Sequence, residues 1–282
     1  MGPAGPRRRG GLKLLPLILF GFYLVYYYFS NQETVPLTGR TQLVDLSREQ
    51  EMALGVQSFR QILRQSAVVR EGEAAQLVQE IGRRIAQVSE DPGFEWEYRL
   101  IQDSQVNAFC LPGGKVAVYT GILPVAKNAD GLAVIMGHEI AHAIARHGAE
   151  RMAHQKLVQF GTLAAAMAVG DMEPRQRMAV MGALGVGAQF GILLPFSREH
   201  ESEADYMGLI YVARACFNPE EAPRLWQRMG EASSGAPSEF LSTHPSHETR
   251  IRQFREWMPE ALKIRAQSCA GNQADERSEL LK

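Results

Sequence analysis

The spacing of apolar residues along this chain predicts a mostly helical protein that also contains a small sheet. In several segments apolar side chains recur every three or four residues, which is typical of helices with one buried face. These segments are residues 47–65, 73–89, 129–146, 197–214, 219–230 and 248–258. Alternating apolar and polar residues at 94–100 and the β-prone run 115–120 predict strands. The fold class that follows is α+β.

An uncharged stretch near the N-terminus predicts one transmembrane helix ahead of this domain. Residues 14–32 carry no charge, and as a helix they would extend about 28 Å, close to the thickness of a bilayer core. Arg7, Arg8, Arg9 and Lys13 precede the stretch. The positive-inside rule therefore places the rest of the chain on the non-cytoplasmic side. We expect the periplasmic side of a bacterial inner membrane, or the mitochondrial inner membrane in a eukaryote.

Two other interpretations of this N-terminus stay open. A cleaved signal peptide would normally end in a small-x-small site, whereas this stretch closes on YYYFSNQ, so we favour an uncleaved single-pass anchor. A mitochondrial presequence is the third interpretation, because the first residues include arginine and no acid.

Changes in composition divide the chain into four regions. They are a basic N-terminus and anchor (1–32), a linker (33–46), a single folded domain (47–266) and a polar tail expected to be disordered (267–282). Within the domain, residues 157–169 and 178–196 are rich in Ala and Gly. We interpret them as buried or interfacial helices, and a hairpin that dips into the membrane is the alternative.

Overall composition narrows the candidate chemistry. Hydrophobic residues make up 45% of the 282 residues, which is enough for a packed core. Lys and Arg number 30 and Asp and Glu 31, so the net charge of −1 gives no electrostatic basis for binding nucleic acid. The three cysteines, Cys110, Cys216 and Cys269, are too few for a disulfide scaffold. A functional site must therefore be built from His, Asp and Glu.

One short motif has the spacing of a zinc site. His138, Glu139 and His142 form H-E-x-x-H within a predicted helix. Residues four apart on a helix lie on nearly the same face, so both imidazoles can reach one ion, as tetrahedral Zn²⁺ requires. Glu139 points about 100° away, where it can hold a water and act as general base. A chance match on a surface helix is the alternative, and the apolar surroundings of the motif argue against it.

A catalytic zinc needs a third protein ligand, and the best candidates lie on the predicted helix at 197–214. Glu201 and Asp205 are four apart and share one face, so one can ligate while the other accepts the distal N–H of a ligand histidine. Glu199 and Glu203 form a similar pair on another face. Spacing alone does not choose between these pairs.

Four motifs in order along the chain are NAFCLPGGKVAVYTG, HEIAH, ESEAD and STHPSHETRI. Together they resemble the HtpX and CAAX-prenyl-protease family of gluzincin metallopeptidases, and most closely its Oma-type quality-control branch. The resemblance runs from about residue 40 to residue 258. It implies a zincin-like domain, one Zn²⁺ per chain, Glu201 as the third ligand and Asp205 as a brace for a ligand histidine. Unlike the multi-span members, this chain has one clear apolar span.

The resemblance also implies how substrate binds. It makes the run at 115–119 an edge strand of the sheet, along which a substrate lies extended and is held by main-chain hydrogen bonds. The strand residues are Lys115, Val116, Ala117, Val118 and Tyr119. An ordinary edge strand without a binding role is the alternative.

The remaining histidines and one arginine complete the candidates. His244, in the His-Pro loop of the fourth motif, either occupies the fourth position on zinc and keeps the enzyme latent, or swings away to assist catalysis. In the second case His244 or the nearby Arg250 donates to the oxyanion. A purely structural histidine is the third possibility. We interpret His147 as a cap at the end of the motif helix and His200 as a surface residue.

The sequence thus predicts a zinc-dependent, membrane-anchored metalloendopeptidase. Its expected substrates are unfolded or membrane-associated proteins, as in protein quality control, and this expectation comes from the resemblance and the anchor. A chaperone-like zinc scaffold without turnover is the alternative, and the intact base Glu139 argues against it. The sequence gives no oligomeric state.

Overall fold

The computed structural model describes residues 12–189, 193–232, 240, 242, 244 and 248–279. The basic cluster Arg7–Arg9 and the Ser/Gly/Pro loop at 233–237 lie outside them. The chain forms two compact units. Unit 1 contains the residues up to Thr34, together with Thr41–Asp45 and Gly148–Glu199, and unit 2 contains the remainder. The sequence predicted one folded domain over 47–266, whereas residues 148–199 group with the N-terminal helix in unit 1.

Unit 2 is built on a four-stranded sheet. Its strands, in spatial order, are β3 (Val68–Val69), β4 (Glu97–Ile101), β6 (Lys115–Tyr119) and β5 (Ala108–Leu111). β6 runs parallel to β4 and antiparallel to β5, with Leu100 opposite Val118 on one side and Ala108 opposite Val118 on the other. β5 therefore forms one edge of the sheet, and the prediction that residues 115–119 form an edge strand is wrong.

The burial of β6 explains this correction. Val116, Ala117 and Val118 are successive residues and all are buried, so both faces of the strand are covered. A continuous apolar run is typical of an interior strand, whereas an edge strand usually alternates or carries charge. Lys115, the charged residue of the run, is also buried, and its ammonium donates to the main-chain oxygen of Glu95.

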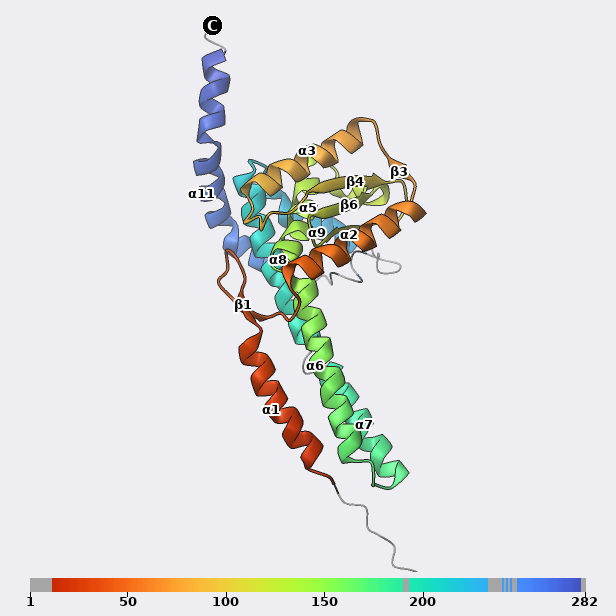
Figure 1. Ribbon diagram of the computed structural model, residues 1–282. Helices are drawn as coiled ribbons and strands as arrows, with labels where there is room; N and C mark the ends of the chain where they lie inside the picture. Colours follow the sequence, from red (N-terminus) through yellow and green to blue (C-terminus); the bar gives the residue numbers. More distant parts are fainter. Residues whose placement is uncertain are drawn as a thin grey trace, which may run out of the picture. The chain divides into compact units, whose positions relative to one another are not determined.

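Helices cover both faces of the sheet (Figure 1). α3 (Glu73–Val88) and α5 (Ala129–Ile144) share the main hydrophobic core with one face, and Phe59 of α2 (Arg48–Gln65) packs with Ile101 and Ala117 on the other. Ser47 and Gln50 form the capping box that begins α2. The other helices with residues in unit 2 are η1 (Thr120–Ile122), α4 (Leu123–Ala126), α8 (Leu194–Arg214), α9 (Glu221–Ala232) and α11 (Glu248–Glu279).

The motif helix α5 is almost entirely buried, which is why its sequence is apolar on every side. Asn128 caps its first turn by accepting a hydrogen bond from the N–H of Gly131 at 2.8 Å. The helix ends at Ile144, two residues before the predicted end. Arg146 then takes a φ of 59°, the left-handed region, and this turns the chain into α6 (His147–Ala168).

α11 is longer than the sequence predicted. The predicted helix stopped at Met258 before Pro259, but α11 continues through that proline to Glu279. The sequence analysis expected a disordered tail from residue 267 onward, whereas residue 267 lies within α11. A disulfide between Cys216 and Cys269 joins the residues after α8 to α11, and Cys110 is a free thiol.

Unit 1 consists of helices and a short hairpin. They are α1 (Leu15–Ser30), β1 (Gln32–Thr34), β2 (Thr41–Leu43), α6, apart from its first residue, and α7 (Pro174–Ala188). Tyr27 of α1, Leu43 of β2 and Ala153 of α6 form a small buried cluster. None of the described residues of α7 is buried, so of the two possibilities predicted for this helix, buried or interfacial, the buried one is wrong.

Across the described residues, no helix combines the length and the apolar character that crossing a membrane requires.

Candidate metal centre

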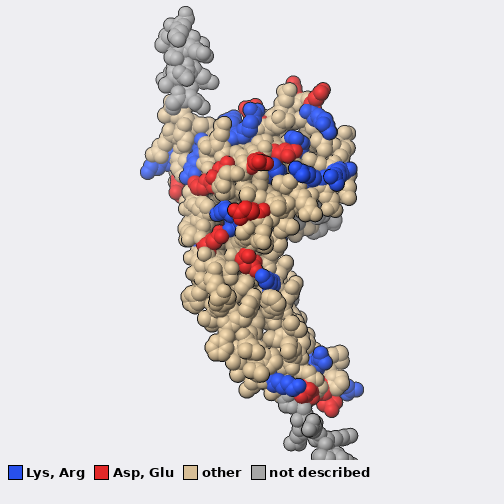
Figure 2. All heavy atoms as spheres, in the orientation of Figure 1, with Lys and Arg blue, Asp and Glu red and all other residues tan. Residues whose placement is uncertain are grey.

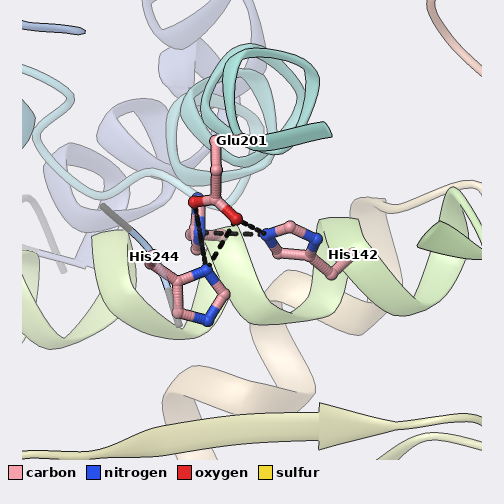
Figure 3. A group of neighbouring side chains, drawn as sticks. His142, Glu201 and His244 are labelled. Carbon is pink, nitrogen blue, oxygen red and sulfur yellow. Dashed lines mark hydrogen bonds and ion pairs between the residues drawn. The ribbon is translucent and has the colours of Figure 1, made fainter. Parts of the chain in front are cut away.

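Four side chains from three parts of unit 2 converge on one point. His138 and His142 come from α5, Glu201 from α8 and His244 from the segment before α11. Each offers one ligand atom, and these atoms all lie within 4.8 Å of one another. Figure 3 shows Glu201 pointing from its helix toward the rings of His142 and His244. The sequence predicted all four residues, and the structure brings them together.

The distances between these atoms fit a zinc ion. Ligands at about 2.05 Å from a tetrahedral Zn²⁺ lie about 3.3 Å from one another. His138 Nε2 is 3.1 Å from His142 Nε2 and 3.3 Å from Glu201 Oε2, and His142 Nε2 is 3.4 Å from Glu201 Oε1. Two imidazoles and one carboxylate are also the donor set that zinc peptidases use. His138, His142 and Glu201 therefore fit as three protein ligands.

His244 supplies a fourth donor to the same group. Its Nδ1 lies 3.2 Å from His138 Nε2 and 2.9 Å from Glu201 Oε1, so it belongs to the same group of donor atoms. A catalytic zinc keeps its fourth position for water, and His244 in this place would compete with water for that position. Pro245, the other half of the predicted His-Pro loop, lies outside the described residues.

A carboxylate and an arginine hold His138 from behind. Asp205 Oδ1 lies 3.0 Å from His138 Nδ1, and Asp205 is paired in turn with two nitrogens of Arg250, one of them at 2.7 Å. Arg250 lies over the ring of Trp226 at 3.3 Å. Burial disfavours a charged His138, but hydrogen bonds to Asp205 and Glu201 outweigh it and raise the pKa of His138 to about 9. Arg250, predicted as an oxyanion donor, thus braces the ligand side of the site.

Glu139 lies beside the ligands without joining them. Its side chain is buried, and its Oε1 accepts no hydrogen bond from the residues that the structure describes. The nearest ring nitrogen, Nε2 of His244, is 3.4 Å away. Burial raises the pKa of Glu139, a direction that favours uptake of a proton. A buried carboxylate next to the ligand group, with an oxygen that accepts no hydrogen bond from the described residues, has the position of a general base.

A second support, which the sequence analysis missed, lies behind His142. Nδ1 of His147 is 2.8 Å from Nδ1 of His142, and Nε2 of His147 is 3.0 Å from Oε2 of Glu203. His147 begins α6 and does not cap α5, and its pKa is lowered by burial to about 4. His200, predicted to lie at the surface, is buried and stacks on His147. The sequence did offer Glu203 as a carboxylate that could serve a metal site, but spacing alone did not show that its partner is His147.

Comparison with known proteins identifies the family. The model of peptidase family M48 matches residues 73–258. The chain belongs to peptidase family M48. Among its relatives are the mitochondrial metalloendopeptidase OMA1 of Schizosaccharomyces pombe, 38% identical over 240 residues (83% of this chain and 69% of the relative), and that of Homo sapiens, 32% identical over 264 residues (89% and 50%). The beta-barrel assembly-enhancing protease of Escherichia coli is 27% identical over 234 residues (81% and 48%).

Membership of family M48 and these relatives make the chain a metalloendopeptidase of the Oma-type branch, as the motifs predicted. The geometry adds what spacing left open. From α8, Glu201 reaches both histidine ligands and Asp205 reaches His138, whereas Glu203 reaches His147. Three carboxylates of the ESEAD motif therefore serve one M48 site from one helix.

Proposed function

We propose that this chain is a zinc-dependent endopeptidase that acts at a membrane on unfolded or membrane-associated proteins. The observation that carries the proposal is the buried carboxylate of Glu139 beside three residues with zinc spacing, with an Oε1 that accepts no hydrogen bond from the described residues. A scaffold without turnover would have no use for a buried carboxylate in that place.

His138, His142 and Glu201 would hold the ion. When bound, zinc lowers the pKa of water toward about 7 and polarises the scissile carbonyl. Glu139 takes the proton of the attacking water and passes it to the leaving amine. Asp205 and Arg250 keep His138 in position for ligation. His244, whose Nδ1 lies among the ligand atoms, would have to move away before water could bind the ion in its place.

β5 replaces β6 as the strand that would bind substrate. It is an edge of the sheet, and it packs on the motif helix α5. Tyr119 N–H donates to Asn107 C=O at 3.0 Å, so the alternation of antiparallel pairing turns the N–H and C=O of Ala108 and Cys110 away from β6. These groups can form main-chain hydrogen bonds with an extended peptide, and such bonds hold a substrate with little selectivity for its side chains.

The surface of unit 1 supports attachment to a membrane. Large apolar side chains are exposed along α1, α6 and α7, and an apolar groove of about 670 Å³ lies among these helices. Figure 2 shows one face of the molecule, on which a long stretch is almost free of Lys, Arg, Asp and Glu, with charges gathered at its end. Residues 12–30, whose helix is flanked by Lys13, would hold the chain at the bilayer.

The names of the OMA1 relatives support a mitochondrial location. The proposal also includes the inner membrane in the case of a bacterium, with the metal centre on the non-cytoplasmic side, and this part rests on the basic residues ahead of the apolar stretch. The proposal is tested by casein cleavage with the purified protein, which should stop with a zinc chelator and resume when zinc is restored. Cleavage that persists at full rate without metal contradicts it.

A further inference from the structure

We propose that His147 and Glu203 orient the metal ligand His142, and that the turn at residues 35–40 anchors this support. The inference rests on the zinc site of the proposed function. It assigns positioning parts to four residues outside the group of ligand atoms: His147, Glu203, Arg40 and Thr38.

The hydrogen bonds run in one direction. Nε2 of His142 faces the other ligands, so a metal-binding His142 carries its proton on Nδ1. That proton points to Nδ1 of His147, 2.8 Å away, which must accept it. The proton of His147 then lies on Nε2, where it is donated to Oε2 of Glu203 at 3.0 Å. Each partner fixes the tautomer of the one before it, and the chain ends on a carboxylate.

The carboxylate of Glu203 is itself held by one short turn. Arg40 reaches Oε2 of Glu203 with Nε at 2.8 Å and with Nη2 at 2.7 Å, and the hydroxyl of Thr38 donates to Oε1. The turn connects β1 to β2 and is closed by the hydrogen bond from Val35 N–H to Arg40 C=O at 2.8 Å. The support of His142 therefore ends on the segment that follows the N-terminal helix.

Two ligand histidines thus have two separate supports. Asp205 and Arg250 hold His138, whereas Glu203 and Arg40 hold His142 through His147. In the second support, the imidazole of His147 lies between the ligand His142 and the carboxylate of Glu203. The ring of His200 lies flat against that of His147, with centroids 4.3 Å apart, and limits its rotation. Burial of His147 and Glu203 keeps water from replacing either hydrogen bond.

The test compares zinc affinity, by competition with a chromogenic chelator, among variants at residue 147. His147→Leu should weaken zinc binding about 10- to 100-fold, and His147→Gln should recover most of it, because an amide can accept from His142 and donate to Glu203. With Co²⁺ in place of zinc, the visible spectrum should change in the Leu variant and return toward wild type in the Gln variant. His154→Leu, seven residues further along α6, is the matched control and should stay within twofold.

Arg40→Met tests the far end of the support. It also provides an independent test of the inference if His147→Leu does not fold. It should weaken zinc binding in the same direction but less, and add nothing further to His147→Leu. The inference is overturned if folded His147→Leu or Arg40→Met binds zinc within twofold of wild type, or if His147→Gln binds no better than His147→Leu. Wild-type protein that binds no zinc at all would instead overturn the proposed function.

Discussion

Nε of Arg146 lies 2.7 Å from Oε2 of Glu51, and both side chains are buried. The same guanidinium donates to the main-chain oxygen of Leu46 at 2.8 Å. These contacts hold Arg146 in its left-handed conformation, and that turn brings His147 back toward His142. A residue of α2 therefore sets the geometry just after the metal-binding helix.

Breaking this pair should cost much of the stability of unit 2. We expect Glu51→Gln to lower the free energy of unfolding by about 3–5 kcal/mol, because it removes the charge of a carboxylate that is paired with a buried guanidinium. Urea unfolding of metal-free protein measures this. Glu49→Gln, an exposed neighbour on the same helix, is the control, and equal stability of the two variants would argue against the role given to the pair.

His244 should restrain the enzyme. Since its Nδ1 lies among the ligand atoms and would compete with water for the ion, His244→Ala should raise basal casein cleavage while three ligands still hold zinc. A fall in the maximal rate by about 10²–10³ with zinc retained would instead show that His244 donates to the oxyanion. An unchanged rate would discard both roles.

A proline on β5 should show whether substrate pairs with this edge. Cys110→Pro removes an N–H that points away from β6, so the sheet should survive. Losing one main-chain hydrogen bond to substrate should lower kcat/KM roughly two- to tenfold. Cys110→Ala, which keeps the N–H, sets the baseline for the loss of the thiol. Equal kcat/KM for the two variants would remove β5 from substrate binding.

The stability of unit 1 should depend on pH through Asp45. Burial opposes ionisation of this carboxyl, but Lys156 donates to it, and the net effect lowers the pKa of Asp45. A lowered pKa means that the stabilisation is present above the unfolded-state value near 3.9 and is lost as pH falls below it. Melting temperatures from pH 2.5 to 7 should therefore show a smaller acid-induced drop for Asp45→Asn, and also for Lys156→Met. Curves parallel to wild type would contradict this.

Local spacing was enough to predict part of the site. His138, Glu139 and His142 lie within five residues on one helix, so their geometry follows from helical periodicity. Glu201 needed the family resemblance, because spacing treated it and Glu203 alike. The resemblance also implied that residues 115–119 form the edge strand that binds substrate. This was wrong, since β-prone residues occur both in the central strands and in the edge strands of a sheet. The signal against an edge was the uninterrupted apolar run of Val116, Ala117 and Val118, all of which are buried in the structure.

Other features depend on contacts between distant parts of the chain. The end of α5 is set by Glu51, about 95 residues earlier in sequence, and no local rule places a left-handed arginine there. The support of His142 needs the turn at 35–40, and the pairing of Cys216 with Cys269 needs α8 and α11 to lie together. Such long-range pairings are not encoded in any single segment.

Whether the metal centre is catalytic is decided by Glu139→Gln, assayed for zinc content and casein cleavage on the same preparation. Removing the base should leave one zinc per chain and reduce cleavage by several orders of magnitude, because no ligand is lost. Glu201→Gln should instead lose zinc itself. Normal cleavage by zinc-loaded Glu139→Gln protein would contradict the mechanism proposed for this site.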